Sequence, residues 1–293
     1  MKIFENLDKL KEIDSDKIVS VGNFDGIHLG HQKILRILVS IAKSEGLKSL
    51  VITFDFHPKS FKKLTILDEK KELIKKYGVD FLFTVNFDDI KNLDAFNFLK
   101  ILRENGVVGY VSGRDHRFGL NREGDIYFIL KNSNFDVVIV SDVEVNGVTV
   151  KSSFIREYLQ KGFIDEVNLM LGRRYSVSGV VVKGSGVGRL WGVPTANILY
   201  SSDKLIPPPG VYAVYVYLGN EKQKFLGACN IDFENNLEVH IFNFSKDLYG
   251  ESLKVEFIKK ISEEKIIKDI EKLKAKIKWD LQKVKDFFKI LER

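Results

Sequence analysis

The chain has 293 residues, a length typical of two domains. Hydrophobic residues make up 44% and charged residues 29%, as in a globular protein, and no apolar run approaches the roughly 18 residues of a membrane span. Lysines alternate with acidic residues, so the net charge of +6 indicates solvated surface and anionic substrates rather than a nucleic-acid-binding stripe. A single cysteine, Cys229, excludes an intrachain disulfide, and the start lacks a signal-peptide pattern, so we expect a cytoplasmic protein without a membrane partner.

The first half alternates short apolar runs with helical patterns. The runs that predict buried strands are Ile18–Val21, Leu50–Phe54, Phe81–Val85, Val107–Val111 and Val137–Val140. This alternation predicts a Rossmann-like α/β domain, with a mainly parallel sheet that is covered on both faces and binds ligands beyond the carboxyl ends of its strands. We expect this domain to span residues 1–160, with a linker at 161–173.

The turn after the first predicted strand reads Val-Gly-Asn-Phe-Asp-Gly-Ile-His-Leu-Gly-His over residues 21–31, and an amphipathic stretch follows it. Such a turn leaves backbone N–H groups at the positive end of a helix, where phosphate binds. The imidazoles of His28 and His31 can add hydrogen bonds to a phosphoryl group. A tight turn with a capping histidine is the alternative, which the paired histidines and three glycines disfavour. The segment resembles the HxGH signature of the nucleotidyltransferase superfamily, which transfers a nucleotide monophosphate from ATP or CTP and releases pyrophosphate.

Three further motifs follow in the first half. The segment 53–58 lies at the end of the second predicted strand. The segment 113–125 mixes carboxylates, cations, aromatics and glycines, a mixture that suits a flat heteroaromatic ligand, although a polar surface loop with ion pairs is the alternative. Ser152, Ser153 and Arg156 open a helix, where serines are usually N-caps but can also hold a leaving pyrophosphate.

Together these motifs resemble the N-terminal FMN adenylyltransferase domain of bacterial bifunctional riboflavin kinase/FAD synthetases. His116 and Phe56 depart from this pattern, since they stand where the family has phenylalanine and proline. The resemblance implies catalytic roles for His28, His31 and Arg156. The ATP-binding residues that it implies are Gly22, Asn23, Phe24, Asp25, Gly30, Ser152 and Ser153. The flavin-binding residues that it implies are Phe54, His57, Asp115, Phe118 and Arg122.

After about residue 174 the pattern changes to short strands with period-two alternation and tight turns. The predicted strands are Tyr175–Val182, Val211–Leu218, Phe225–Ile231, Leu237–Phe244 and Leu253–Ile258. They predict a small antiparallel Greek-key β-barrel over residues 174–293. A long C-terminal helix follows, with an apolar stripe that we expect to pack on the barrel or between domains, formed by Ile266, Ile270, Leu273, Ile277, Leu281, Val284, Phe288 and Leu291.

Two motifs in the second half carry chemistry. A glycine cluster at 184–189 can wrap a phosphate chain, although such a cluster is often only a turn. The Pro-Thr-Ala-Asn segment at 194–197 is more specific, because Thr195 and Asn197 offer oxygen ligands for Mg²⁺. This segment is similar to the signature of the riboflavin kinase barrel, and the segments 207–212, 237–244 and 247–250 match that family too.

The resemblance to riboflavin kinases implies that Glu238 activates the ribityl hydroxyl of riboflavin. Alternation places Glu238, His240 and Phe242 on one strand face and apolar residues on the other, so we expect Glu238 on the outside of the barrel. The implied ATP-binding residues of this domain are Gly184, Gly186, Gly188 and Arg189, and the implied metal ligands are Thr195 and Asn197. The chain departs from the family after its last strand, where Lys259, Lys260, Ile266 and Ile267 replace the usual arginine and phenylalanine.

The sequence therefore predicts a bifunctional enzyme that phosphorylates riboflavin to FMN and adenylylates FMN to FAD, with ATP and Mg²⁺. We expect small-molecule partners (riboflavin, FMN and ATP), no nucleic acid, and a monomer or weak homo-oligomer. The alternatives are a monofunctional FMN adenylyltransferase with a weak or regulatory flavin-binding barrel, another adenylyl- or cytidylyltransferase with an accessory barrel, and a flavin-sensing regulator. A single-stranded nucleic-acid binder would stack bases on Tyr212, Tyr215 and Tyr217, which do not share one strand face.

Overall fold

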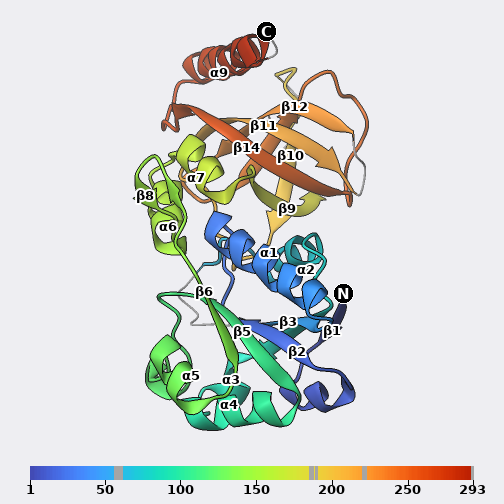
Figure 1. Ribbon diagram of the computed structural model, residues 1–293. Helices are drawn as coiled ribbons and strands as arrows, with labels where there is room; N and C mark the ends of the chain where they lie inside the picture. The colour runs from blue at the N-terminus through green and yellow to red at the C-terminus, as the bar shows by residue number, and fades with distance from the viewer. Residues whose placement is uncertain (56–61, 185–187, 189–190, 220–222, 292–293) are drawn as a thin grey trace. The chain divides into compact units, whose positions relative to one another are not determined.

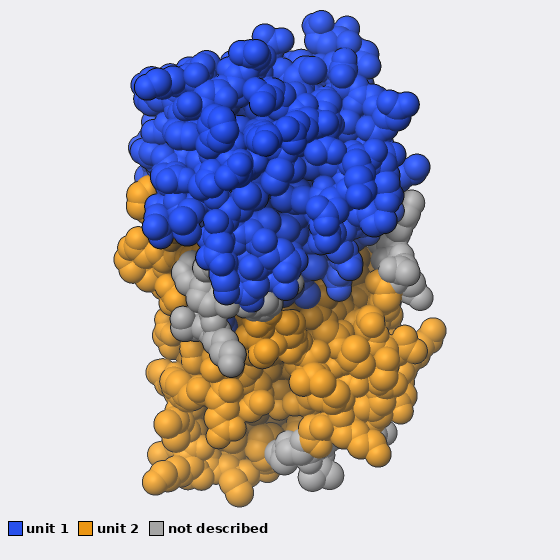
Figure 2. Space-filling model, turned by 90° about the horizontal axis from the view of Figure 1, so that it is seen from below, with its two compact units in different colours: residues 1–152 blue, residues 153–293 orange. Residues whose placement is uncertain are grey.

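The computed structural model describes residues 1–55, 62–184, 188, 191–219 and 223–291. They form two compact units, Met1–Ser152 and Ser153–Arg293, which are coloured separately in Figure 2. Each unit is described by itself. Among the described residues, none of the helices is long and apolar enough to cross a membrane.

The first unit contains a six-stranded sheet in the order β1-β4-β3-β2-β5-β6, and all its strand pairs are parallel. The strands are β1 (Lys2–Phe4), β2 (Lys17–Val21), β3 (Lys48–Asp55), β4 (Phe81–Asn86), β5 (Val107–Gly113) and β6 (Asp136–Val140). The five predicted strands are confirmed. Strand β1 was not predicted, because three mostly exposed residues are too short to show a hydrophobic period.

Helices cover both faces of this sheet, as predicted (Figure 1). They are α1 (Leu29–Ser44), α2 (Leu67–Lys75), α3 (Phe87–Ile90), α4 (Ala95–Glu104) and α5 (Ile126–Asn132), with 3-10 turns η1 (Leu7–Glu12) and η2 (Leu120–Arg122) and a small hairpin of β7 (Glu144–Val145) and β8 (Val148–Thr149). Ile18 belongs to the core under α1 and α2, whereas Val19 and Val21 belong to the core under α4 and α5. Alternate residues of each parallel strand therefore feed two cores, and polar side chains gather at the carboxyl edge.

The second unit begins with α6 (Ser152–Gln160) and α7 (Ile164–Leu171). Helix α7 lies within the expected linker at 161–173, yet it packs on the barrel: Asn168 donates to the carbonyl oxygen of Phe257 at 2.9 Å and accepts from the N–H of Tyr175 at 2.7 Å. This helix belongs to the barrel unit. The expected domain boundaries stay a prediction.

The barrel closes in the order β10-β13-β12-β11-β14-β9. Its strands are β9 (Tyr175–Val182), β10 (Ala196–Tyr200), β11 (Gly210–Leu218), β12 (Lys224–Ile231), β13 (Leu237–Ile241) and β14 (Ser252–Glu263). The strands β11, β12 and β13 form a meander, and β14 returns beside β11, which is the Greek-key order that the sequence predicted. Strand β10 was not predicted, although it continues the Pro-Thr-Ala-Asn motif and closes the barrel between β13 and β9.

The C-terminal helix α9 (Ile270–Leu291) lies over the outside of the barrel (Figure 1). Val284 and Phe288 join a core with residues of β11 and β14. The expectation that the whole stripe packs in a core is wrong: Ile266 precedes the helix and is 80% exposed, and Ile270 is 60% exposed. Val284 and Phe288 are buried, whereas Leu291 at the end of the stripe is 49% exposed, so the buried part of the stripe lies between its two ends.

His116, which departs from the family pattern, packs inside the first unit. Its Nε2 lies 2.8 Å from the buried hydroxyl of Tyr110, and its ring stacks on Phe118 with centroids 5.4 Å apart. Removal of the ring from water lowers the pKa of His116 to about 4. The folded chain therefore holds a neutral imidazole that would be protonated in the unfolded chain near pH 5 to 6.

We expect this residue to make the first unit acid-sensitive. Below pH 6.5 the unfolded state binds the proton more readily than the folded state, so stability falls as the pH drops towards 4, by about 3 kcal/mol in total. Urea unfolding at successive pH values measures this loss. The double variant Tyr110→Phe/His116→Phe removes the titrating group without leaving an unpaired hydroxyl, and an equal acid loss in that variant would contradict the prediction.

Candidate active sites

The paired histidines lie at the start of α1. His28 is the N-cap, and its Nδ1 accepts a hydrogen bond from the N–H of His31 at 3.4 Å. The two rings stack at 3.7 Å between centroids, with 20° between their planes. Because Nδ1 of His28 is an acceptor, its neutral ring carries the proton on Nε2, which can donate to an anion. The two imidazoles thus form one polar surface at a helix N-terminus, where an anion is stabilised.

The turn before these histidines is held in an uncommon conformation. Phe24 and Ile27 have φ angles of 49° and 39°, although neither is glycine, and both side chains are buried. Left-handed backbone of this kind costs free energy and persists only when the surroundings impose it. Gly30 contributes by its small size, since a Cβ there would lie 3.2 Å from the His28 ring. The burial of both side chains therefore holds the turn in this conformation.

Two residues expected to bind ATP make contacts within this turn. The carboxylate of Asp25 accepts from the N–H groups of Leu64 (3.3 Å) and Thr65 (3.0 Å). The hydroxyl of Ser152 donates to the carbonyl oxygen of Asp25 at 2.8 Å. These bonds tie the turn to residues 64–65 and to Ser152, so both side chains hold the turn in place.

Sequence reasoning missed a buried cation beside the turn. Lys70 of α2 is 4% exposed, and its ammonium lies 3.2 Å from Thr53 Oγ1, 3.3 Å from the carbonyl oxygen of Phe54 and 3.4 Å from Asn23 Oδ1. A lysine in an amphipathic helix has the pattern of a solvated residue, so nothing in the sequence distinguished it. Here it holds Asn23 against the carboxyl end of β3.

A cavity of about 550 Å³ opens at the same edge of the sheet. Three of the expected flavin-binding residues line it, namely Phe54, Phe118 and Arg122, together with Gly22 and Asn23 of the phosphate turn. Further lining residues that the sequence did not single out are Phe87, Ile90, Leu93, Phe98 and Arg117. The wall is aromatic and cationic, which suits a flat ring that carries a phosphate.

The remaining expected residues of this site do not line the cavity, belong to the second unit or lie outside the described residues. Asp115 is absent from the described lining of the cavity, and its carboxylate pairs with Lys151 at 3.1 Å. His57 lies outside the described residues. Ser153 and Arg156 belong to the second unit, so their place beside the histidines stays a prediction.

The polar cluster of the barrel is built by strand register. Asn197 of β10 and Asn230 of β12 lie opposite Glu238 of β13 on its two sides. The hydroxyl of Thr195 donates to Glu238 Oε2 at 3.4 Å. On the opposite face of β13 the side chains of Leu237, Val239 and Ile241 are buried, so Glu238 faces outwards, as alternation predicted. The sequence did not single out Asn230, because its position beside Glu238 depends on the pairing of β12 with β13.

The glycine cluster lets the chain approach this motif closely. A Cβ at Gly184 would lie 2.1 Å from Nδ2 of Asn197, and one at Gly188 would lie 2.5 Å from the carbonyl oxygen of Val193. The N–H of Val193 donates to the carbonyl oxygen of Gly188 at 2.9 Å. Gly186 and Arg189 lie outside the described residues.

We expect Gly184→Ala to impair the barrel site without unfolding the barrel, because the new methyl group must displace the Asn197 amide. Displacement of a positioned group by about 1 Å costs on the order of 100-fold in rate. The initial rate of the reaction at the barrel site measures the effect. The double variant Gly184→Ala/Asn197→Ala has no amide to displace, so its melting temperature should equal that of Asn197→Ala alone. A wild-type rate for the single variant Gly184→Ala would refute the expectation.

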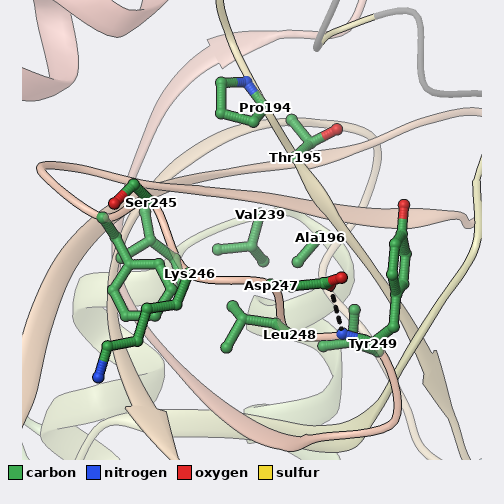
Figure 3. Close-up of a pocket in the computed structure, with 12 residues that line it drawn as sticks. Pro194, Thr195, Ala196, Val239, Ser245, Lys246, Asp247, Leu248 and Tyr249 are labelled. Atoms are coloured by element: carbon green, nitrogen blue, oxygen red, sulfur yellow. Dashed lines mark hydrogen bonds between the residues drawn. The ribbon is translucent and has the colours of Figure 1, made fainter.

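Two cavities have Thr195 as a common lining residue. The first, of about 350 Å³, has Pro194, Thr195, Ala196 and Val239 on its wall and the loop 244–249 around it (Figure 3). In that loop the carboxylate of Asp247 accepts from the N–H of Tyr249 at 3.1 Å. Most of the wall is apolar, and the ring of Tyr249 stands at its edge, which suits a flat base.

The second cavity, of about 260 Å³, lies between the barrel and α9. Its apolar wall comes from Leu273, Ile277 and Leu281 of α9 with Trp191, and its polar side holds Thr195 and Glu238. Burial raises the pKa of Glu238, an environment that suits a base working near neutrality. Thr195 thus lines both cavities.

Buried charges anchor the helix that forms this wall. Asp280 of α9 is 4% exposed and accepts from Ser262 of β14 and from Lys276, each at 2.6 Å. A buried carboxylate needs such partners, because an unpaired charge is costly away from water. The polar trio fixes where α9 crosses the end of β14 and so shapes the second cavity.

The fold and the two sites together define an ATP-dependent transferase with two domains: a Rossmann-like sheet with a phosphate turn, and a barrel with adjoining cavities. Residues 10–154 match the family FAD synthetase, and residues 171–288 match the family riboflavin kinase. A bifunctional riboflavin kinase/FMN adenylyltransferase of Buchnera aphidicola subsp. Schizaphis graminum is 35% identical, over 99% of this chain and 100% of its own length. One from Listeria monocytogenes is 34% identical, over 95% of each chain.

Among solved structures, one from Streptococcus pneumoniae that is described as a macrolide-efflux protein has a TM-score of 0.86 and 27% sequence identity. It covers 97% of this chain and 98% of its own length. The chain belongs to the bifunctional riboflavin kinase/FMN adenylyltransferase family.

Proposed function

We propose that the protein makes FAD in two steps at the two sites described above. The barrel phosphorylates riboflavin with ATP, and the N-terminal domain transfers AMP from a second ATP to FMN. The observation that carries the kinase assignment is the position of Thr195, which lines a base-sized cavity and an acceptor cavity and donates to Glu238. A purely regulatory barrel would not need a half-buried carboxylate bonded to a residue that lines two cavities.

In the kinase step, ATP occupies the cavity near Tyr249, and riboflavin occupies the cavity under α9. The ribityl hydroxyl oxygen attacks the γ-phosphorus, the bond from that phosphorus to the β–γ bridging oxygen breaks, and ADP leaves. Glu238 accepts the hydroxyl proton and later releases it to water. Thr195 holds the carboxylate in place during this transfer.

The donor set fits Mg²⁺. The hydroxyl of Thr195 donates its hydrogen bond to Glu238, so its oxygen lone pairs can bind a cation, and Asn197 supplies an amide oxygen. Two neutral oxygens suit a hard cation that takes its other ligands from phosphates and water. The bound ion would neutralise charge on the transferred phosphoryl group.

In the adenylyl step, a phosphate oxygen of FMN attacks the α-phosphorus of ATP, the bond to the α–β bridging oxygen breaks, and pyrophosphate leaves. His28 donates from Nε2 to the α-phosphoryl oxygens, with His31 beside it. The N–H groups at the start of α1 add to this stabilisation. Phe54, Phe118 and Arg122 hold the flavin side of FMN. Arg156 and Ser153 hold the leaving pyrophosphate.

The proposal includes the setting in which the enzyme works. We propose a cytoplasmic protein that acts as a monomer or weak homo-oligomer and binds no nucleic acid. The mixture of acidic and basic residues along the chain supports the last point.

Incubation with riboflavin, ATP and Mg²⁺, followed by chromatographic separation of riboflavin, FMN and FAD, tests the function. FAD formed from riboflavin, and lost when EDTA removes Mg²⁺, supports both steps in one chain. FAD formed only from added FMN would leave the barrel a regulatory domain, and the absence of both products would overturn the proposal.

A further inference from the structure

We propose that His240 is a positioning residue for riboflavin phosphorylation, which holds the turn that carries Thr195 in register with Glu238. The inference rests on the proposed kinase function. Nδ1 of His240 lies 2.8 Å from the carbonyl oxygen of Pro194, 46 residues earlier in the chain. A carbonyl oxygen is only an acceptor, so Nδ1 carries the hydrogen and donates, in the neutral and in the charged ring alike.

His240 contacts Pro194, which precedes the residues of β10 that pair with β13. The pairing of β10 with β13 begins at Ala196, opposite Val239. Pro194 and Thr195 precede the strand, and proline has no N–H that could join a ladder. The imidazole therefore supplies an anchor between β13 and the backbone that leads into Thr195.

The ring itself is held in one orientation. It packs edge-to-face against Phe242, two residues along β13, with centroids 5.4 Å apart. The ammonium of Lys285 on α9 lies 5.3 Å from the centroid of the Phe242 ring. A side chain fixed by packing on one side and by a hydrogen bond on another loses few conformations when the substrates bind, so it can set the position of a neighbour.

Thr195 contacts the proposed base, Glu238, and also lines both cavities. Its hydroxyl lies 3.4 Å from Glu238 Oε2. His240 and Glu238 lie on the same face of β13, so one strand face holds both the base and the anchor of its partner. Loss of the anchor should therefore lower the rate of phosphoryl transfer. His240 also lines the cavity under α9, so the test compares variants that keep or remove the donor at the position of Nδ1.

Three substitutions separate this role from general packing. Asparagine places its amide nitrogen where Nδ1 lies, glutamine places it near Nε2, and leucine keeps the bulk without a donor. We expect His240→Leu and His240→Gln to lower the kcat of riboflavin phosphorylation by about 10- to 100-fold. All three variants change the wall of the riboflavin cavity, so the comparison between them is made on kcat at saturating riboflavin. We expect His240→Asn to recover kcat to within about fivefold of the wild type. FMN adenylylation by the same chains serves as the internal control and should be unchanged.

Amide hydrogen exchange of residues 193–198 provides a readout that does not depend on kinase activity. Exchange should rise in His240→Leu and His240→Gln and return towards the wild-type value in His240→Asn. Equal kcat values in the asparagine and glutamine variants, or unchanged exchange in the leucine variant, would overturn the positioning role. A wild-type chain that makes no FMN would instead overturn the proposed kinase function, and the exchange data would still decide whether His240 anchors the turn.

Discussion

His31→Ala should lower the rate of FAD formation from FMN and ATP by about 100- to 1,000-fold. The imidazole lies at a preformed helix N-terminus, stacked on His28 at 3.7 Å, where a developing negative charge is stabilised without reorganisation. Riboflavin phosphorylation by the same chain should stay near the wild-type rate. The two half-reactions are assayed separately, with FMN or riboflavin as the only flavin supplied.

Lys43→Ala is the matched control, because it changes an exposed residue in the last turn of the same helix and should leave both rates unchanged. His28 needs a different substitution, since its side chain also caps the helix, and loss of a cap costs about 1 kcal/mol. His28→Asn keeps an acceptor for the N–H of His31 and removes the Nε2 donor. Parallel loss of both activities in His31→Ala would argue against two separate sites.

Glu238→Gln should show the opposite selectivity. A glutamine keeps the shape of the side chain but cannot accept the ribityl proton, so riboflavin phosphorylation should fall by about 100- to 10,000-fold. FAD formation from added FMN should be unaffected. Chromatography of the flavins after incubation with each substrate measures both rates.

The pH profile provides a second test of Glu238. The carboxylate is the active form, so kcat falls as the pH drops through its pKa, and burial raises that pKa above the ordinary glutamate value. The acid limb of the wild-type profile should therefore lie nearer neutrality than an ordinary glutamate allows, and it should vanish in Glu238→Gln. The matched control is Glu234→Gln, in the exposed turn before β13. An unchanged acid limb in Glu238→Gln would assign the base to another residue.

Local hydrophobic patterning was sufficient for most of the fold. The parallel strands were predicted because buried runs such as Leu50–Phe54 stand out against polar neighbours, and β13 was predicted because Leu237, Val239 and Ile241 alternate with polar residues. Strand β10 lacked such a signal, since its five residues follow a proline and are only partly buried. Its place between β13 and β9 depends on the closure of the barrel.

The candidate sites divide in the same way. His28, His31, Thr195 and Glu238 stood in compact motifs whose residue types carry their chemistry. Lys70 did not stand in such a motif. Its position became evident only in the folded chain, where tertiary packing buries it against three oxygen atoms.

The sequence by itself determined the two-domain order, the strands of the parallel sheet, the phosphate turn and the outward face of Glu238, because each depends on the spacing of neighbouring residues. Only the tertiary structure decided that Thr195 lines two cavities, that Asn230 lies opposite Glu238, that His240 contacts Pro194, and that Ile270 at the start of α9 is exposed. These features arise from strand register and helix docking, which bring together residues as far apart in the chain as Pro194 and His240. No local pattern encodes such distances, since the free energy that selects them comes from the packing of the whole barrel.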